Sequence, residues 1–185
     1  MSLVTSGRSE GSAPLTEISV PPRSTVAVTL DESMISESGA GTSAIVQSVN
    51  GVPVVAERTV FYATEEVDGV ASEIGAPSAT ERWLLGLATS RPETDSVVLL
   101  NPGAGDVTVT LELLRVDGRT LKPRTLRDLA VARGARLRVP ISDQTDGEAM
   151  GVIVTATGPV VAERFSYSSG AGDVASLMGI PLPGG

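Results

Sequence analysis

The sequence predicts an all-β protein, an antiparallel β-sandwich built from about one and a half copies of a repeated unit. Three observations support this prediction. Aromatic residues make up only 3% of the chain, so the core must consist of Val, Leu, Ile and Ala, and the β-branched residues among these favour strands. Short apolar runs separated by turn residues recur along the chain. The six residues PVVAER occur twice, at 53–58 and at 159–164.

The repeat extends well beyond this six-residue motif. Four blocks, the motif among them, recur in the same order: 18–30 with 129–141, 43–46 with 151–154, 53–58 with 159–164, and 69–77 with 173–181. The segment 81–118 has no counterpart earlier in the chain. We therefore expect residues 1–78 to form the C-terminal half of one sandwich unit and residues 79–185 to form a complete unit. Together they would be an excerpt from a longer array.

The individual strands are predicted from short β-branched runs, many of which alternate apolar with polar residues. Turn residues separate these runs, notably Asn101-Pro102-Gly103 and Asp117-Gly118. The predicted strands are 25–30, 53–62, 96–100, 107–114, 135–141, 152–157 and 159–167.

Three segments favour a helix when they are considered alone. Residues 124–134 place apolar side chains on one helical face, but the repeat partner contains Val20-Pro21-Pro22, and consecutive prolines are excluded from a helix interior. We therefore expect 124–134 to be extended or a turn. The segments 70–75 and 174–179 each space two apolar residues four apart and end in glycine, so we expect one helical turn in each.

The two Glu-Arg dipeptides of the repeated motif are Glu57-Arg58 and Glu163-Arg164. Neighbouring residues in a strand point to opposite faces of the sheet, so a Glu and the Arg next to it are badly placed to act on one substrate. Because Phe165 shares a face with Glu163, we expect one charge to lie at a partly buried sheet margin and to pair across strands. A structural role is thus favoured over a ligand contact, and both over catalysis.

The composition excludes several classes of function. The chain has no cysteine and no histidine, which removes thiol nucleophiles, Cys/His zinc sites and every Ser-His arrangement. A net charge of −8 argues against nucleic-acid binding, because neutralising phosphates requires a basic surface. No apolar run is long enough to cross a bilayer, and the first eleven residues do not form a signal peptide, although we expect that an export signal could precede them.

Two charged segments are candidate binding sites. Asp143, Asp146 and Glu148 resemble a calcium loop in composition, but their spacing differs from that of an EF-hand, so a polar surface loop is favoured. The other segment is basic, and we expect either a solvated edge or a surface that contacts an acidic neighbouring unit or an anionic polymer. Its residues are Arg115, Arg119, Lys122, Arg124, Arg127, Arg133, Arg136 and Arg138.

In combination, several motifs resemble a family. Trp83 is followed by LLNPG at 99–103, a Val/Thr-rich strand, an Asp-Gly turn, ARGARLRV at 132–139 and the second PVVAER. This order resembles the repeated β-sandwich unit of secreted or envelope-anchored actinobacterial proteins of unknown function. The resemblance implies an immunoglobulin-like sandwich and a location outside the cytoplasm. It brings no catalytic residues.

The function we expect is non-catalytic, that of a structural or adhesive module that serves as spacer or interaction surface in an extracellular array. Its partners would be neighbouring units or a cell-envelope polymer, and no catalytic, metal-binding or cofactor-binding residue is predicted. The alternative is a carbohydrate-binding or envelope-polymer-binding module with Trp83 on its surface, which the scarcity of aromatic residues disfavours. Because half a unit is left over, we also expect a homodimer through the incomplete unit.

Overall fold

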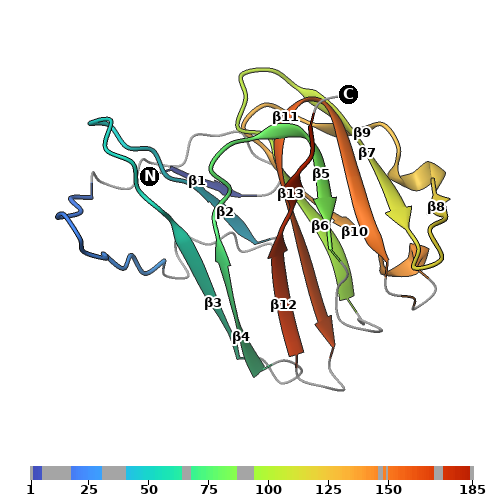
Figure 1. Cartoon of the computed structure of the whole chain (residues 1–185), viewed down its shortest axis with the longest axis horizontal. Helices are drawn as coiled ribbons and strands as arrows, with labels where there is room; N and C mark the ends of the chain where they lie inside the picture. The colour runs from blue at the N-terminus through green and yellow to red at the C-terminus, as the bar shows by residue number, and fades with distance from the viewer. Residues whose placement is uncertain are drawn as a thin grey trace.

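The structure is a computed structural model that describes residues 2–5, 18–30, 41–63, 68–86, 94–145, 148, 150–168 and 173–183. Within these ranges the regular elements are β-strands, together with short 3₁₀ turns such as η2 (Arg124–Leu126) and η3 (Ser142–Gln144). All the strand pairs are antiparallel. The prediction of an all-β, sandwich-like antiparallel fold is confirmed (Figure 1).

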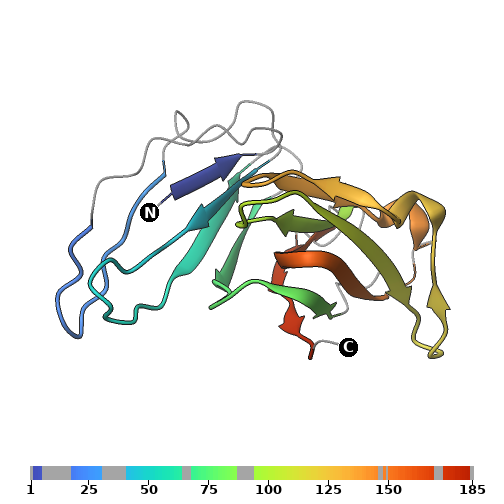
Figure 2. The same ribbon diagram turned by 90° about the horizontal axis from the view of Figure 1, so that it is seen from above.

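Strand pairing divides the described chain into two parts. Strands β1 (Ser2–Thr5) and β2 (Thr42–Ile45) pair with each other, and β3 (Glu57–Ala63) forms a hairpin with β4 (Asp68–Ile74). All later strands belong to one hydrogen-bonded network, and Figure 2 shows β1–β4 as a layer beside it. These later strands are β5 (Thr80–Leu85), β6 (Thr94–Leu100), β7 (Val107–Leu114), β8 (Thr120–Leu121), β9 (Leu129–Val131), β10 (Arg136–Pro140), β11 (Gly151–Ser168), β12 (Asp173–Met178) and β13 (Ile180–Pro181).

The 18-residue strand β11 belongs to both layers of the sandwich. Its first part, up to Ala156, pairs with β5 and β7, and its second part, from Val161, pairs with β6 and β12. The register with β5 shifts between Thr155 and Val160, where the sequence contains Gly158-Pro159. Proline cannot donate a ladder hydrogen bond and glycine permits a bend, so this dipeptide suits the point at which β11 passes between layers.

The core lies between these two layers. Along β7 buried residues alternate with half-buried ones, and the buried set includes Val109, Leu111 and Leu113. These side chains pack in one cluster with Val97 and Leu99 of β6. Burial of such aliphatic side chains stabilises a domain by about 1.5–3 kcal/mol each. Aliphatic residues thus supply most of the core, as the low aromatic content predicts.

The sandwich strands predicted at 96–100, 107–114 and 135–141 are present to within two residues at the ends, whereas the two strands predicted at 152–157 and 159–167 form the single strand β11. Residues 124–134 form η2 and β9, which agrees with the expectation of an extended or turn segment. The strand predicted at 25–30 is wrong, since these residues belong to no strand. Val26 and Val28 are each 41% exposed, and without a neighbouring strand an alternating pattern does not define a strand.

The helical turns predicted at 70–75 and 174–179 are also wrong, because residues 70–74 belong to β4 and residues 174–178 belong to β12. A spacing of four residues, as between Val70 and Ile74, places two side chains on one face of a helix but also on one face of a strand. Six consecutive pairs between β11 and β12, and seven between β3 and β4, decide in favour of the strand.

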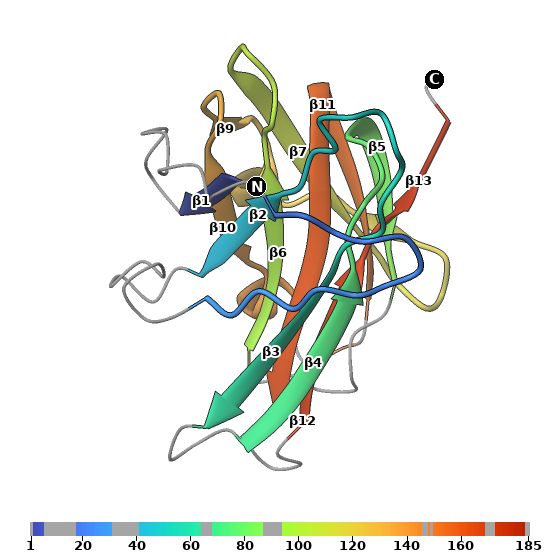
Figure 3. The same ribbon diagram turned by 90° about the vertical axis from the view of Figure 1, so that its left-hand side faces the viewer.

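The two hairpins share one register. Glu57 lies opposite Ile74 in β3–β4, and Glu163 lies opposite Met178 in β11–β12. Each hairpin ends with a glycine N–H donating to an alanine carbonyl, from Gly75 at 2.9 Å and from Gly179 at 3.0 Å. The β3–β4 hairpin lies against β12 and the second part of β11, over the sheet face that points away from the core (Figure 3).

Candidate functional site

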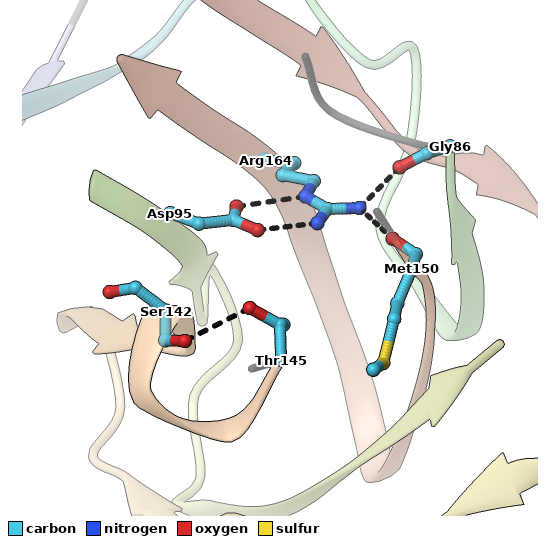
Figure 4. A network of polar contacts seen from close by, with 6 residues as sticks. All are labelled: Gly86, Asp95, Ser142, Thr145, Met150 and Arg164. Atoms are coloured by element: carbon cyan, nitrogen blue, oxygen red, sulfur yellow. Dashed lines mark hydrogen bonds and ion pairs between the residues drawn. The ribbon is translucent and has the colours of Figure 1, made fainter. Parts of the chain in front are cut away.

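The Arg of the second motif lies in the core of the sandwich. Arg164 and Asp95 have side chains that are each only 1% exposed. Arg164 Nε donates to Asp95 Oδ1 at 2.9 Å and Nη2 to Oδ2 at 2.5 Å, a bidentate ion pair. Nη1 donates to the carbonyl oxygens of Gly86, at 2.6 Å, and Met150 (Figure 4). The buried charge is therefore neutralised and hydrogen-bonded, as burial of a charge requires.

This ion pair connects segments that are far apart in the sequence. Arg164 lies on β11 and Asp95 on β6, while Gly86 follows β5 and Met150 precedes β11. One guanidinium thus fixes the end of one strand and the start of another relative to the sheet. In Figure 4 the adjacent turn, in which Thr145 Oγ1 donates to the Ser142 carbonyl at 2.9 Å, lies beside this network.

Glu163 points to the opposite face of β11, as the alternation of a strand requires. Its carboxylate accepts a hydrogen bond from Ser176 Oγ at 2.5 Å and forms an ion pair with Arg58, the Arg of the first motif. Arg58 Nη2 also donates to Ser176 Oγ at 3.1 Å. The Glu163 side chain is 10% exposed and that of Arg58 37%. Each member of the Glu163-Arg164 dipeptide therefore has a partner of its own.

Aromatic and basic side chains surround this second ion pair. The Tyr62 and Phe165 rings lie 5.6 Å apart, and the Arg138 guanidinium lies 5.4 Å from the Phe165 ring centroid, within cation–π range. Arg138 Nε donates to Ser96 Oγ at 3.1 Å. We call Arg58, Tyr62, Arg136, Arg138, Glu163, Phe165 and Ser176 the interlayer cluster, because they lie where the β1–β4 layer meets the outward face of the sandwich.

Burial shifts the acid–base equilibria of this cluster. Desolvation raises the pKa of the Tyr62 phenol above 10.0, and the nearby Arg58 partly offsets this effect. Desolvation lowers the pKa of the Arg136 guanidinium, and Glu163 partly offsets that. Arg136 Nε donates to Ser43 Oγ of β2 at 3.1 Å. The cluster thus has the contacts of a packed, polar interface between layers.

The basic segment does not form one continuous surface. Arg136 is buried, Arg138 is half-buried, and Arg115 forms an ion pair with Glu148 at 2.7 Å. The remaining five side chains are exposed, although Lys122 reaches Glu112 at 2.5 Å: Arg119, Lys122, Arg124, Arg127 and Arg133.

The prediction that Trp83 belongs to an interaction surface is wrong. Trp83 is 1% exposed, and its Nε1 donates to the carbonyls of Val160 at 2.9 Å and Thr80 at 3.2 Å. A Cβ on Gly179 would lie only 2.8 Å from the Trp83 ring. The apolar area of the ring and its satisfied N–H together explain why the residue lies in the core.

The structure describes only part of the acidic segment that resembles a calcium loop. Asp143 lies in η3 and Glu148 pairs with Arg115, while Asp146 lies outside the described residues. In the described part of the chain, no group of three or more acidic, His or Cys residues is placed to hold a metal ion. The same residues contain no helix of the length and apolarity that would be needed to cross a membrane.

Sequence reasoning missed two buried polar residues that the fold depends on. Asp95 lies between Thr94 and Ser96 at the polar start of β6, two residues after Glu93, so the sequence does not distinguish it from a solvent-exposed strand end. Asn101 was predicted only as a turn residue, but it is fully buried, and its Nδ2 donates to the carbonyls of Gly105 at 2.8 Å and Val131 at 3.0 Å. Asn101 thereby ties the start of β7 to β9.

One protein-family model matches most of this chain. A model described as "Family of unknown function (DUF5719)" matches residues 34–168. The chain belongs to the DUF5719 family. The matched range of this DUF5719 protein contains both PVVAER motifs and ends with β11.

Two solved structures are similar to this DUF5719 chain. One is "Crystal Structure of Thermotoga maritima 1070", with a TM-score of 0.48 and 11% identity over 58% of this chain and 98% of that chain. The other is "Anabaena sensory rhodopsin transducer", with a TM-score of 0.40 and 19% identity over 46% and 95%, respectively. No curated protein matches the sequence.

Proposed function

We propose that this chain is a non-catalytic structural module, one sandwich unit and part of another in an extracellular or envelope-anchored array, which serves as spacer or interaction surface. One observation carries the proposal. Three of the four charged residues of the repeated motif form ion pairs within the protein, Arg164 with Asp95 in the core and Arg58 with Glu163 between the layers. Residues used in this way hold layers together and are not available to a substrate.

Two further observations support an array. The β3–β4 and β11–β12 hairpins have the same sequence pattern and the same register, as copies of one unit would. The hairpin of the first copy packs directly on the second, so successive units would be in contact rather than joined only by a flexible linker. Direct contact of this kind would hold successive units at a fixed distance and orientation, as a spacer in an array requires.

Single-molecule stretching tests the spacer role. The full chain would be placed between two marker domains and extended from both ends. We expect a force-resistant step that releases the β5–β13 network, whose fully extended length is about 350 Å at roughly 3.4 Å per residue, so the length gain is this value less the span of the folded network. A trace in which the chain extends without such a step would contradict the spacer proposal.

A second candidate is binding of an anionic envelope polymer, which the five exposed basic side chains between Arg119 and Arg133 favour. Co-sedimentation with a wall teichoic acid preparation at low and high salt tests this candidate. We expect binding that weakens with salt and that is lost when Arg119, Arg124 and Arg127 are changed to Glu. Binding that survives the triple change would contradict the assignment to this surface.

A further inference from the structure

The outward face of the β3–β4 hairpin carries large apolar side chains that are exposed. Phe61 is 76% exposed, Val70 55% and Ile74 60%. Phe61 and Val70 lie opposite each other in the register, and Ile74 lies on the same face, beyond the polar Thr59–Ser72 pair. The other face, with Arg58 and Tyr62, points toward the sandwich. Exposed large apolar side chains on one face of a hairpin whose other face is covered indicate an interaction surface.

The equivalent face of β11–β12 is covered. In the shared register Phe61, Val70 and Ile74 correspond to Tyr167, Val174 and Met178. Val174 is only 8% exposed. The β3–β4 hairpin supplies the cover, through Arg58 and Tyr62. The chain therefore already shows how a face of this type is covered, namely by the inward face of a hairpin of the same type.

The polar groups that hold the covering hairpin are also repeated. Glu163 and Ser176, which bind Arg58, correspond to Glu57 and Ser72 in β3–β4. Glu57 is exposed, and among the described residues it forms no ion pair. Ser72 Oγ lies 2.8 Å from Thr59 Oγ1 on the same face. The carboxylate and the hydroxyl of the docking site are present, but the guanidinium is not.

We propose that the outward face of β3–β4 docks a further β-hairpin of the same repeat, whose arginine pairs with Glu57 as Arg58 pairs with Glu163. This inference rests on the proposed array function and names the contact by which the array would continue. Charge favours this occupant over a second copy of the same face. Among the described residues, the outward face of β3–β4 carries the carboxylates of Glu57 and Asp68 and no basic side chain, so two such faces would repel, whereas an arginine-bearing hairpin is complementary.

A single introduced cysteine reports whether the face is covered, because the chain has no other cysteine. Val70→Cys would be labelled with a maleimide in the full chain and in the same chain with a second copy of residues 53–76 at its N-terminus. A Gly/Ser linker of about 20 residues spans roughly 25 Å and keeps the added hairpin at high effective concentration. Val174→Cys, at the covered equivalent position, is the matched control.

We expect Val70→Cys to react at least tenfold more slowly when the extra hairpin is present. Glu57→Arg should restore fast labelling, and reversing the arginine of the added hairpin to Glu in that background should slow it again. Equal labelling rates with and without the added hairpin would overturn the proposal. Slow labelling that Glu57→Arg leaves unchanged would also overturn it. Val174→Cys should stay slow throughout. If it becomes fast, the added hairpin has displaced the existing one, which also contradicts the proposal.

The labelling result is independent of the stretching experiment, which uses the chain without an added hairpin. A force-resistant step with an unprotected Val70→Cys would reject the docking face and leave the spacer role intact. The converse, protection without such a step, would reject the spacer role alone.

Discussion

The two hairpins differ in what surrounds them, although their sequences and registers agree. In β11–β12 the motif arginine lies in the core against Asp95, and the motif glutamate lies under the β1–β4 layer. In β3–β4 the arginine reaches the next hairpin and the glutamate faces solvent. The local sequence therefore sets strand pairing, whereas the neighbouring strands decide whether a charge is buried, half-buried or exposed.

The same contrast in burial distinguishes all the described residues before Trp83 from those that follow it. Of the buried hydrophobic residues that the structure describes, only Ala71 precedes Trp83. Of the exposed large hydrophobic residues, only Val116, Leu177 and Ile180 follow it. Residues 18–74 thus have little core of their own and depend on the sandwich for burial. Substitutions at matched positions of the two regions should therefore differ in cost.

The largest expected effect is at the core ion pair. Arg164→Met leaves Asp95 as an unpaired buried charge, so we expect a loss of about 3–5 kcal/mol in the free energy of unfolding. Urea denaturation followed by the fluorescence of Trp83 measures it. Adding Asp95→Leu should recover a large part of the loss, because the double variant has no buried charge. An unchanged midpoint in Arg164→Met would show that Asp95 is not buried in this way.

The glycines that end the hairpins give the second comparison. A Cβ at Gly179 would lie 2.8 Å from the Trp83 ring and 2.9 Å from Leu85, so Gly179→Ala should cost about 1–3 kcal/mol through overpacking. At Gly75 the nearest atom is the Ala56 carbonyl oxygen at 3.4 Å. Gly75→Ala should therefore change stability by no more than about 0.5 kcal/mol. Equal costs in thermal denaturation would remove the distinction between the two hairpins.

The interlayer ion pair should contribute less than the core pair. Arg58 is 37% exposed and water can replace part of its contact with Glu163, so we expect Arg58→Ala to cost about 1 kcal/mol. Because the pair is partly solvated, this cost should shrink in high salt. A cost equal to that of Arg164→Met in the same denaturation assay would mean that the first hairpin is as essential to the fold as the second.

The smallest effect is confined to alkaline pH. The folded-state pKa of Tyr62 lies above that of the unfolded chain, so the stability linked to this phenol is complete below pH 10 and is lost as pH rises through the folded pKa. Tyr62→Phe should therefore flatten the decline of stability above pH 10 and leave the pH dependence below pH 9 unchanged. Denaturation midpoints across this range, with Tyr167→Phe as control, measure the difference.

Much of the fold follows from the sequence where local pattern and tertiary packing agree. The alternation at 107–114 matches β7, and the prolines at 21–22 correctly excluded a helix in the repeat partner at 124–134. Pattern failed where it was ambiguous, as in the spacing of Val70 and Ile74, or where no strand was available to pair, as at 25–30.

The candidate site was harder to predict than the fold. The opposite orientations of Glu163 and Arg164 follow from strand geometry, but their partners do not. Asp95 lies 69 positions from Arg164 in the sequence, and Arg58 lies 105 from Glu163. Contacts over such separations depend on how the layers stack. Trp83 was misplaced for the same reason, since its burial requires Gly179 and Val160 to lie beside it.

The membership of β11 in both layers has a consequence for the order of folding. Neither sheet is complete until a strand near the end of the chain has joined β5, β6 and β7, so the dominant contacts are distant in sequence and folding should take milliseconds to seconds. On a ribosome that adds 5–20 residues per second, β11 is finished about 3–14 seconds after β6. During that interval the apolar strands already made have unpaired edges, and a chaperone that holds them would raise the yield of native protein.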